Sequence, residues 1–305
     1  MRRFDLTILG CGAAAPTPYY LTTSQIVNIH DHLILIDCGE CTQLTLRKNR
    51  IKFQKIRFIL ISHMHADHIM GLPGLIASMN LLGRKLPLDV FGPKELEGLI
   101  KQIWFLTDTH IEFEVRFHTT NANEITEIHK SESYAITSFP TKHRVPTCGY
   151  RIKETEGFRN IKSGAKIKFG LVQHEINKLK RGEDVIRECG SVLTPDTCCS
   201  KQLQSRSYVY AADTAYSLKV VDAAKNATLL YHEATFMEKD KKIASKTLHS
   251  TSRDASKVAL EANVKKMIIG HFSSRYRDLK PLLAESRELF INCELAVEGR
   301  SIVVE

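Results

Sequence analysis

Residues 56–68 read IRFILISHMHADH, an apolar run that ends in three histidines and an aspartate within six residues. The run Ile56–Ile61 predicts a buried strand. Because side chains two apart on a strand point to the same side, His63 and His65 can face one site, and the following turn brings the last two polar residues toward a neighbouring position. Clustered buried imidazoles need partners and repel one another once protonated. The cluster therefore predicts a site for two metal ions, with zinc as the first candidate.

Two such coordination spheres need more ligands than this cluster supplies, since a reacting water must also be held. Three further residues are candidates: His143, Asp213 and His271. Asp213 and His271 each follow an apolar run that predicts a strand, and a sheet presents ligands at its strand ends. A purely structural metal is disfavoured, because structural zinc sites are usually closed tetrahedra built around cysteine.

The rest of the chain mixes predicted strands and helices throughout its length. The predicted strands are Phe4–Leu9, Gln25–Ile29, Leu33–Asp37, Ile56–Ile61, Leu88–Gly92, short β-like runs over 111–153, Tyr208–Asp213, Leu229–His232, Lys266–Gly270, Leu295–Val297 and Ile302–Val304. The predicted helices are Cys41–Lys48, Gly71–Leu82, Pro93–Trp104, Ser252–Ala262 and one around Pro281–Leu289. This mixture indicates an α/β protein, with either two sheets flanked by helices or one large mixed sheet.

Charge and cysteine content favour a protein that binds a polyanion and keeps its cysteines reduced. The net charge of +9 favours a polyanionic partner such as nucleic acid, and residues 151–182 concentrate nine Lys or Arg against three Glu. Composition alone favours a solvated loop for this stretch over an RNA-gripping arm. No run of about 20 apolar residues predicts a membrane span, and the absence of a signal peptide predicts a cytoplasmic protein with reduced cysteines. Cys38 and Cys41 form a CxxC without a matching second pair.

Several motifs occur together and in a fixed order over residues 9–276. They are Leu9-Gly10-Cys11-Gly12 with Pro16-Thr17-Pro18, Ile36-Asp37-Cys38-Gly39-Glu40 with Thr42-Gln43, His63–His68, Gly71-Leu72-Pro73-Gly74, His143-Arg144-Val145-Pro146 with Gly149-Tyr150-Arg151, His232-Glu233-Ala234-Thr235, His249-Ser250-Thr251, and His271 with Ser273-Ser274-Arg275-Tyr276. In these motifs the sequence resembles the metallo-β-lactamase superfamily, and within it the ribonuclease Z family, which trims the 3′ trailer of precursor tRNA. The whole set is far more specific than HxHxDH alone.

The resemblance implies two zinc ions per subunit, with manganese as an alternative metal. It assigns to one ion His63, His65 and His143, to the other Asp67, His68 and His271, and to both the bridging carboxylate of Asp213. It implies that Asp37 orients ligands through hydrogen bonds. Asp67 would accept a proton from the attacking water, while His249, held by Glu233, would lie near the scissile phosphate.

The resemblance also implies the architecture and the reaction. We expect one catalytic domain over residues 1–305, a four-layer αββα sandwich with a protruding basic arm inserted at 151–200. We expect a homodimer that cleaves precursor tRNA through a hydroxide activated by two zinc ions, leaving a 3′-hydroxyl. Two departures from the family stand out: Cys41 replaces a usual glycine, and Gly170-Leu171-Val172-Gln173 stands where the arm usually has a Gly-Pro pair.

Three other functions are compatible with parts of this pattern. The first keeps the fold and changes the substrate, to small or cyclic phosphodiesters or to lactams or thioesters; His249-Ser250-Thr251 and the basic stretch disfavour the latter two. The second is an RNA-binding protein without turnover, which the complete set of five histidines and two aspartates disfavours. The third is the purely structural metal already considered.

Overall fold

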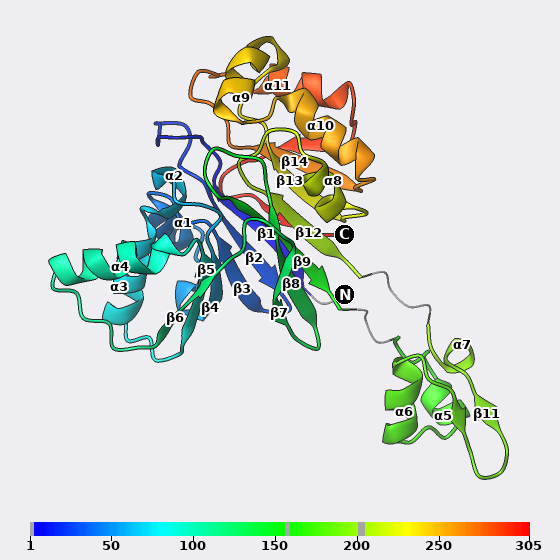
Figure 1. The fold of residues 1–305 in the computed structure, drawn as a ribbon. Coiled ribbons are helices and arrows are strands. Elements are labelled where there is room, and N and C mark those ends of the chain that lie inside the picture. Colours follow the sequence, from blue (N-terminus) through cyan, green and yellow to red (C-terminus); the bar gives the residue numbers. More distant parts are fainter. Residues whose placement is uncertain (1–2, 156–158, 201–204) are drawn as a thin grey trace. The chain divides into compact units, whose positions relative to one another are not determined.

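The computed structural model describes residues 3–155, 159–200 and 205–305, and it divides into two compact units (Figure 1). The larger, here called the main unit, contains Met1–Lys130, Ala135–Ile152 and Ser207–Glu305. The smaller, here called the arm unit, contains Ser131–Tyr134 and Lys153–Arg206.

The first sheet of the main unit has seven strands in the order β16-β1-β2-β3-β4-β5-β6. Their bounds are β1 Phe4–Gly10, β2 Ser24–Ile29, β3 His32–Ile36, β4 Ile56–Leu60, β5 Leu88–Gly92, β6 Val115–Thr119 and β16 Ser301–Val303. Strands β3 to β6 pair in parallel, whereas β16, β1, β2 and β3 pair antiparallel. The sheet is therefore mixed, and β4 leads into the histidine cluster from its parallel half.

The second sheet also has seven strands, in the order β15-β14-β13-β12-β9-β8-β7. Their bounds are β7 Thr126–Lys130, β8 Tyr134–Pro140, β9 Cys148–Glu154, β12 Ser207–Ala211, β13 Leu229–Glu233, β14 Lys266–Gly270 and β15 Cys293–Leu295. Strands β12 to β15 pair in parallel. β12 and β13 are buried along their whole length, as strands covered on both faces are.

Helices cover the outer faces of both sheets, which gives the four-layer α/β sandwich that the family resemblance implies (Figure 1). Beside the first sheet lie α1 Thr42–Lys48, α2 Ala66–Ile69, α3 Leu72–Leu81 and α4 Glu95–Leu106, with the 3-10 turn η1 Phe53–Lys55. Beside the second lie α8 Leu218–Ala224, α9 Lys241–Thr247, α10 Ser252–Glu261 and α11 Lys280–Arg287, with η2 Glu238–Asp240. No helix in the described part of the chain is both long and apolar enough to cross a membrane.

Three buried tyrosines of the second sheet fix its position against the first. Tyr150 donates to the carbonyl of Ile61 at 2.6 Å, Tyr208 donates to Gln25, and Tyr210 donates to the carboxylate of Asp37 at 2.6 Å. A buried hydroxyl without such a partner would be costly, so each bond selects one alignment of the two sheets.

Most predicted elements are present, and the differences lie at their ends. The predicted strand Leu295–Val297 is observed as β15, which ends at Leu295, and the predicted helix Pro93–Trp104 is observed as α4, which begins at Glu95. After β15 the apolar pair Ala296 and Val297 continues past the hydrogen-bonded strand, and before α4 the proline that suggests a helix start lies two residues ahead of the helix, so the pattern alone places both boundaries wrongly.

The arm unit has secondary structure and a small core of its own. Its elements are α5 Ala165–Lys168, α6 Gln173–Lys180, β10 Val185–Ile186, β11 Val192–Leu193 and α7 Pro195–Cys198. The core consists of Leu171, Leu179, Val185, Leu193, Cys198 and Cys199. The solvated loop that composition alone favours for 151–182 is therefore wrong, because the residues after 182 supply four of the six residues of this core. Glu156, counted in that basic stretch, lies outside the described residues.

The two ends of the arm insertion meet at its base. The amide of Glu154 donates to the carbonyl of Arg206 at 2.9 Å, and the Arg206 guanidinium donates to the Glu154 carboxylate at 2.7 Å. Arg151, which was counted with the basic stretch, belongs instead to the main unit, where it donates to the carbonyl of Ala223 at 2.9 Å.

Candidate active site

The predicted ligands follow strands of both sheets. His63, His65, Asp67 and His68 follow β4 of the first sheet, and three others follow β8, β12 and β14 of the second: His143, Asp213 and His271. The structure brings all seven side chains together, in groups whose ligand atoms lie within 4.8 Å of one another. Residues more than 200 positions apart in the chain thus share one pocket.

One group consists of three histidines and the carboxylate of Asp213. Nε2 of His63 lies 2.9 Å from Nδ1 of His65, and Nε2 of His143 lies 3.4 Å from that same nitrogen. Oδ2 of Asp213 is 3.6 Å from Nε2 of His63 and 3.9 Å from Nε2 of His143. The four side chains converge from both sheets on one small volume.

The second group lies against the other side of the Asp213 carboxylate. Nε2 of His68 and Nε2 of His271 are each 3.5 Å from Oδ2 of Asp67. Asp213 places Oδ2 3.7 Å from the His68 nitrogen and Oδ1 3.3 Å from the His271 nitrogen. Asp213 therefore stands between the two groups, where a bridging carboxylate would have to be.

Two nitrogens of this pocket indicate that a cation belongs in it. Nε2 of His68 and Nε2 of His271 are buried and make no hydrogen bond in the part of the chain that the structure describes. Buried polar atoms without a partner are uncommon, and both nitrogens face carboxylate oxygens. Imidazole nitrogen with carboxylate oxygen is a donor set that zinc accepts, so the residues fit the metal pair that the family resemblance implies.

The protonation preferences of the histidines agree with that fit. Burial lowers the pKa of His63, His65 and His143, which leaves the imidazoles neutral and able to donate a lone pair. Burial also opposes a charge on His68, but the carboxylates of Asp213, Asp37 and Asp67 outweigh it and raise the pKa of His68 well above its usual value. The pocket therefore favours positive charge, which a proton or a metal cation can supply.

Contacts behind the ligands hold their rings in place. Asp37, predicted to orient ligands, accepts from the Ser62 amide at 2.7 Å and from Tyr210, and its Oδ2 lies 2.8 Å from Nδ1 of His68. Nδ1 of His271 lies 2.9 Å from the hydroxyl of Thr235. Such contacts fix which ring nitrogen faces the centre.

Sequence reasoning missed several of these supports. Ser62 Oγ lies 2.9 Å from Nδ1 of His63, and the carbonyl of Leu248 lies 3.1 Å from Nδ1 of His143. The Ala14 amide donates to Asp67 at 2.8 Å. Thr235 stands inside a quoted motif and could have been found there. Tyr210 lies in a buried strand, where nothing in the sequence marks it.

Two site residues have a positive φ, a backbone conformation that residues other than glycine rarely adopt. Asp37 has a φ of 54° at the end of β3, and His271 has a φ of 59° at the end of β14. The left-handed region costs a non-glycine residue roughly 1 kcal/mol or more, and it persists only when the surroundings enforce it. At both positions the turn directs the side chain into the pocket instead of along the strand.

Backbone contacts also fasten the cluster to the loop after β3. The Cys38 amide donates to the carbonyl of His68 at 2.7 Å, and the Gly71 amide donates to the carbonyl of Cys38 at 2.8 Å. A Cβ on Gly71 would lie 2.2 Å from the carbonyl oxygen of Gly39. The two segments pack backbone against backbone, which only glycine permits here.

His249 and Glu233, the predicted catalytic pair, lie at the edge of the pocket. Nδ1 of His249 is 2.8 Å from Oε1 of Glu233 and 4.0 Å from Oδ2 of Asp213. Glu233 also accepts from the amides of Thr214 and Ser250 at 3.0 and 3.1 Å. Burial opposes the charge, but Glu233 and Asp213 together raise the pKa of His249, so that the imidazole is protonated at neutral pH.

Other candidates lie outside the site. His232 is fully buried, and its Nδ1 lies 2.6 Å from the carbonyl of Glu233, as in a structural histidine. Cys38 is buried and Cys41 exposed, and no cysteine joins a metal-ligand group among the described residues.

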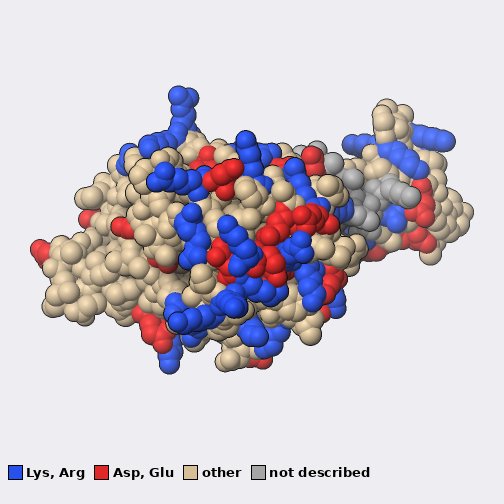
Figure 2. Space-filling model, turned by 90° about the horizontal axis from the view of Figure 1, so that it is seen from above, with Lys and Arg blue, Asp and Glu red and all other residues tan. Residues whose placement is uncertain are grey.

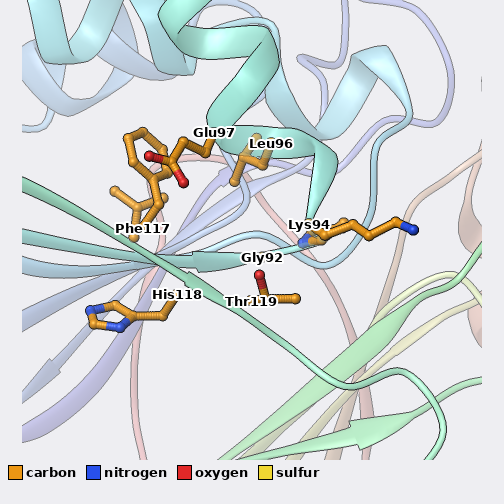
Figure 3. Close-up of a pocket in the computed structure, with 9 residues that line it drawn as sticks. Gly92, Lys94, Leu96, Glu97, Phe117, His118 and Thr119 are labelled. Atoms are coloured by element: carbon orange, nitrogen blue, oxygen red, sulfur yellow. The ribbon is translucent and has the colours of Figure 1, made fainter.

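A separate pocket beside β5 and β6 has none of this chemistry (Figure 3). It is lined by Val90, Gly92, Pro93, Lys94, Leu96, Glu97, Phe117, His118 and Thr119. Its volume of about 10 Å³ is that of a single water. His118 points away from it, and Nε2 of His118 lies 2.8 Å from the carboxylate of Asp89.

Comparisons with known proteins identify the family of this chain. Residues 4–292 match the family model described as Anti-Pycsar protein Apyc1. Ribonuclease Z of Parabacteroides distasonis is 38% identical over 308 residues and covers 100% of both chains. Ribonuclease Z of Bacteroides thetaiotaomicron is also 38% identical, over 100% of this chain and 96% of the relative. The chain belongs to the ribonuclease Z family.

Solved structures of ribonuclease Z relatives and of other proteins share the fold. Human tRNase Z, short form, superimposes with a TM-score of 0.71 at 23% identity, covering 99% of both chains. The metallo-β-lactamase fold protein YhfI of Bacillus subtilis gives 0.68 at 19% identity, again over 99% of both. The prediction of a metallo-β-lactamase sandwich is confirmed. Family membership confirms the prediction of an endoribonuclease and implies the use of a divalent metal, which the clustered His and Asp side chains could bind.

Proposed function

We propose that this ribonuclease Z is a zinc-dependent endoribonuclease that removes the 3′ trailer from precursor tRNA and leaves a 3′-hydroxyl. The observation that carries the proposal is the position of Asp213 between two groups of ligands, with His249 4.0 Å from the same carboxylate. His63, His65 and His143 would hold one ion, Asp67, His68 and His271 the other, and Asp213 both. When bound, the two ions supply an activated water and neutralise charge on the phosphate.

The chain's own residues position the substrate and move protons. Asp67, anchored by the Ala14 amide, is placed to accept the proton that the attacking water releases. Water adds to phosphorus while the bond to the ribose 3′ oxygen breaks. Because Nδ1 of His249 is engaged with Glu233, its Nε2–H is the group that can donate to the departing oxygen. Glu233 keeps His249 protonated and correctly turned for that step.

The arm unit is the proposed binding site for the body of precursor tRNA. Lys166, Lys168, Lys178 and Lys180 are basic residues of its helices α5 and α6. Phosphate contacts of this type confer affinity without reading sequence. We further propose that the protein is a homodimer and acts in the cytoplasm. Sedimentation of the purified protein would test the oligomeric state.

Cleavage of a labelled precursor tRNA, with and without a chelator, tests the proposal. We expect cleavage at the start of the trailer, a product that ligates through its 3′-hydroxyl, and loss of activity in chelator that zinc restores. His63→Ala and Asp213→Ala should abolish cleavage and lower the zinc content of the purified protein. His118→Ala, a histidine outside the pocket, is the matched control and should leave both unchanged.

The alternative is a phosphodiesterase that acts on small or cyclic phosphodiesters. Bis(p-nitrophenyl) phosphate and a cyclic nucleotide, assayed beside the precursor tRNA, distinguish the two functions. Hydrolysis of the cyclic nucleotide without cleavage of precursor tRNA would reject the tRNA substrate while leaving the metal pocket intact.

A further inference from the structure

Three lysines form a continuous column along η2 and α9 in the main unit. Lys239, Lys242 and Lys246 are all exposed, and their spacings of three and four residues place them on one side of the segment. Like charges at these spacings destabilise a helix. The lysine column therefore lowers the stability of this helical segment. Such a cost is expected where the lysines bind an anionic partner.

The acidic groups nearby are already engaged with other residues. The Glu238 carboxylate binds Lys241 at 2.7 Å through one oxygen and Thr251 at 2.8 Å through the other. Asp240 accepts from Tyr276 and lies 3.7 Å from the Arg275 guanidinium. Across residues 3–155, 159–200 and 205–305, no carboxylate forms an ion pair with any member of the lysine column. Its charges face solvent.

The column connects directly to the candidate active site. Helix α9 ends at Thr247 and is capped by Leu248, whose φ is 56°, and the next residue is His249. The His249 amide donates to the carbonyl of Ala244 at 3.0 Å, and the Leu248 carbonyl lies 3.1 Å from Nδ1 of the metal-ligand candidate His143. Figure 2 shows Lys and Arg side chains, with acidic ones among them, on the face above α9 to α11. The C-terminal end of α9 therefore lies next to His249, so the lysine column is within reach of a strand bound at that residue.

We propose that the lysine column binds the phosphate backbone of the RNA strand immediately next to the cleaved bond. This rests on the proposed function and adds to it a second RNA contact, separate from the arm unit. Seven residues of helix span about 10 Å, over which one strand of a duplex presents about three phosphates. Lysine binds phosphate as a point charge and reads no base, so the contact is independent of sequence.

The triple variant Lys239→Gln, Lys242→Gln, Lys246→Gln tests the contact. Binding of a labelled precursor tRNA is measured against salt concentration in chelator, so that no cleavage interferes. The logarithm of the association constant falls linearly with the logarithm of the salt concentration. Loss of three phosphate contacts should make this negative slope shallower by about 2 to 3. In the holoenzyme the KM for precursor tRNA should rise about tenfold or more, with hydrolysis of bis(p-nitrophenyl) phosphate changed less than twofold.

The triple variant Lys48→Gln, Lys52→Gln, Lys55→Gln is the matched control. These lysines are also exposed, and they lie at the end of α1 and before β4, away from the strand ends that carry the ligands. This control should leave the salt slope and the KM unchanged.

Each result decides one question. An unchanged salt slope in the α9 variant overturns the contact, as does an equal loss on precursor tRNA and on the small diester, which would show that α9 only positions His249. A slope that falls by the same amount in the control variant also overturns it, since the effect would then be one of net charge. If the wild type binds precursor tRNA but never cleaves it, the proposed function fails, and the salt slope still decides the contact.

Discussion

Tyr210 links the two sheets to the ligands through one hydroxyl. Its bond to Asp37 spans the interior, and Asp37 in turn holds Nδ1 of His68 at 2.8 Å. All three side chains are buried, so water cannot replace a lost partner. The orientation of a candidate metal ligand thus depends on a residue that touches no metal.

Tyr210→Phe should lower metal affinity by about 10- to 100-fold, because the partner of a ligand-orienting carboxylate is lost. The control is Tyr208→Phe, another fully buried tyrosine of β12, whose hydroxyl donates to Gln25 instead. Competition with a chromophoric zinc chelator measures the affinity of both variants. Equal affinities in the two variants would contradict the role given to Tyr210.

At the scale of elements, the turn that carries the ligands depends on close backbone packing. Gly71→Ala would bring a Cβ to within 2.2 Å of the Gly39 carbonyl oxygen, so we expect a loss of about 1–3 kcal/mol in unfolding free energy together with reduced metal binding. Gly74→Ala is the control, three residues further along the chain and inside α3. It meets nothing within 4 Å and should be neutral or stabilising. Denaturant unfolding of both variants is the measurement.

In the arm unit, an ion pair ties α6 to the turn after β10. The Arg187 guanidinium, with the Val172 amide, lowers the pKa of Glu175 from 4.5 to about 2. Because the pKa of Glu175 is lower in the folded arm than in the unfolded chain, its ionised carboxylate stabilises the folded arm fully at pH values above 4.5. That contribution is lost as the pH falls through about 2.

Pepsin digestion between pH 4 and pH 2 measures this contribution. Glu175→Gln should be cut within residues 159–200 faster than wild type at pH 4, and the difference should shrink toward pH 2. Glu183→Gln, which removes an exposed pair with Arg181, is the control and should behave as wild type. A difference between Glu175→Gln and wild type that stays constant with pH would contradict the ionic origin.

The elements that could be predicted are those whose burial dictates their composition. β4, β12 and β14 are mostly buried, with Arg57 of β4 exposed and Lys266 of β14 half-buried, so each is largely apolar and a polar candidate ligand follows within three residues. The arm could not be predicted in the same way. Its core draws one residue at a time from short, mostly polar segments between Leu171 and Cys199, too sparsely for any periodicity.

At the scale of the whole molecule, we expect the arm unit to be needed for binding precursor tRNA and the main unit to carry out the hydrolysis. Replacing residues 159–200 with a short Gly-Ser linker should impair cleavage of precursor tRNA by about tenfold or more while sparing hydrolysis of bis(p-nitrophenyl) phosphate. The whole segment must be removed, because a cut at residue 182 would divide the arm's core. Equal loss on both substrates would show instead that the arm serves the active site.

The seven candidate ligands could be named from the sequence because three histidines and an aspartate within six residues are rare by chance, because Asp213 and His271 each follow an apolar run, and because the motifs around all seven resemble one family. Their assembly was not predictable from spacing: His143, Asp213 and His271 meet the cluster only because two sheets stack face to face. The left-handed turns at Asp37 and His271 were likewise not predicted, because positive φ remains uncommon even for Asp and His, the types that adopt it more often than most other side chains.

The paired ends at Glu154 and Arg206 make the insertion an exchangeable module. A foreign RNA-binding hairpin or small domain whose termini lie equally close could be grafted onto β9 and β12 without stretching either strand. Natural variation in target RNA could arise by the same route. Replacement of the arm insertion alone would change what is recognised and leave the candidate active site unchanged.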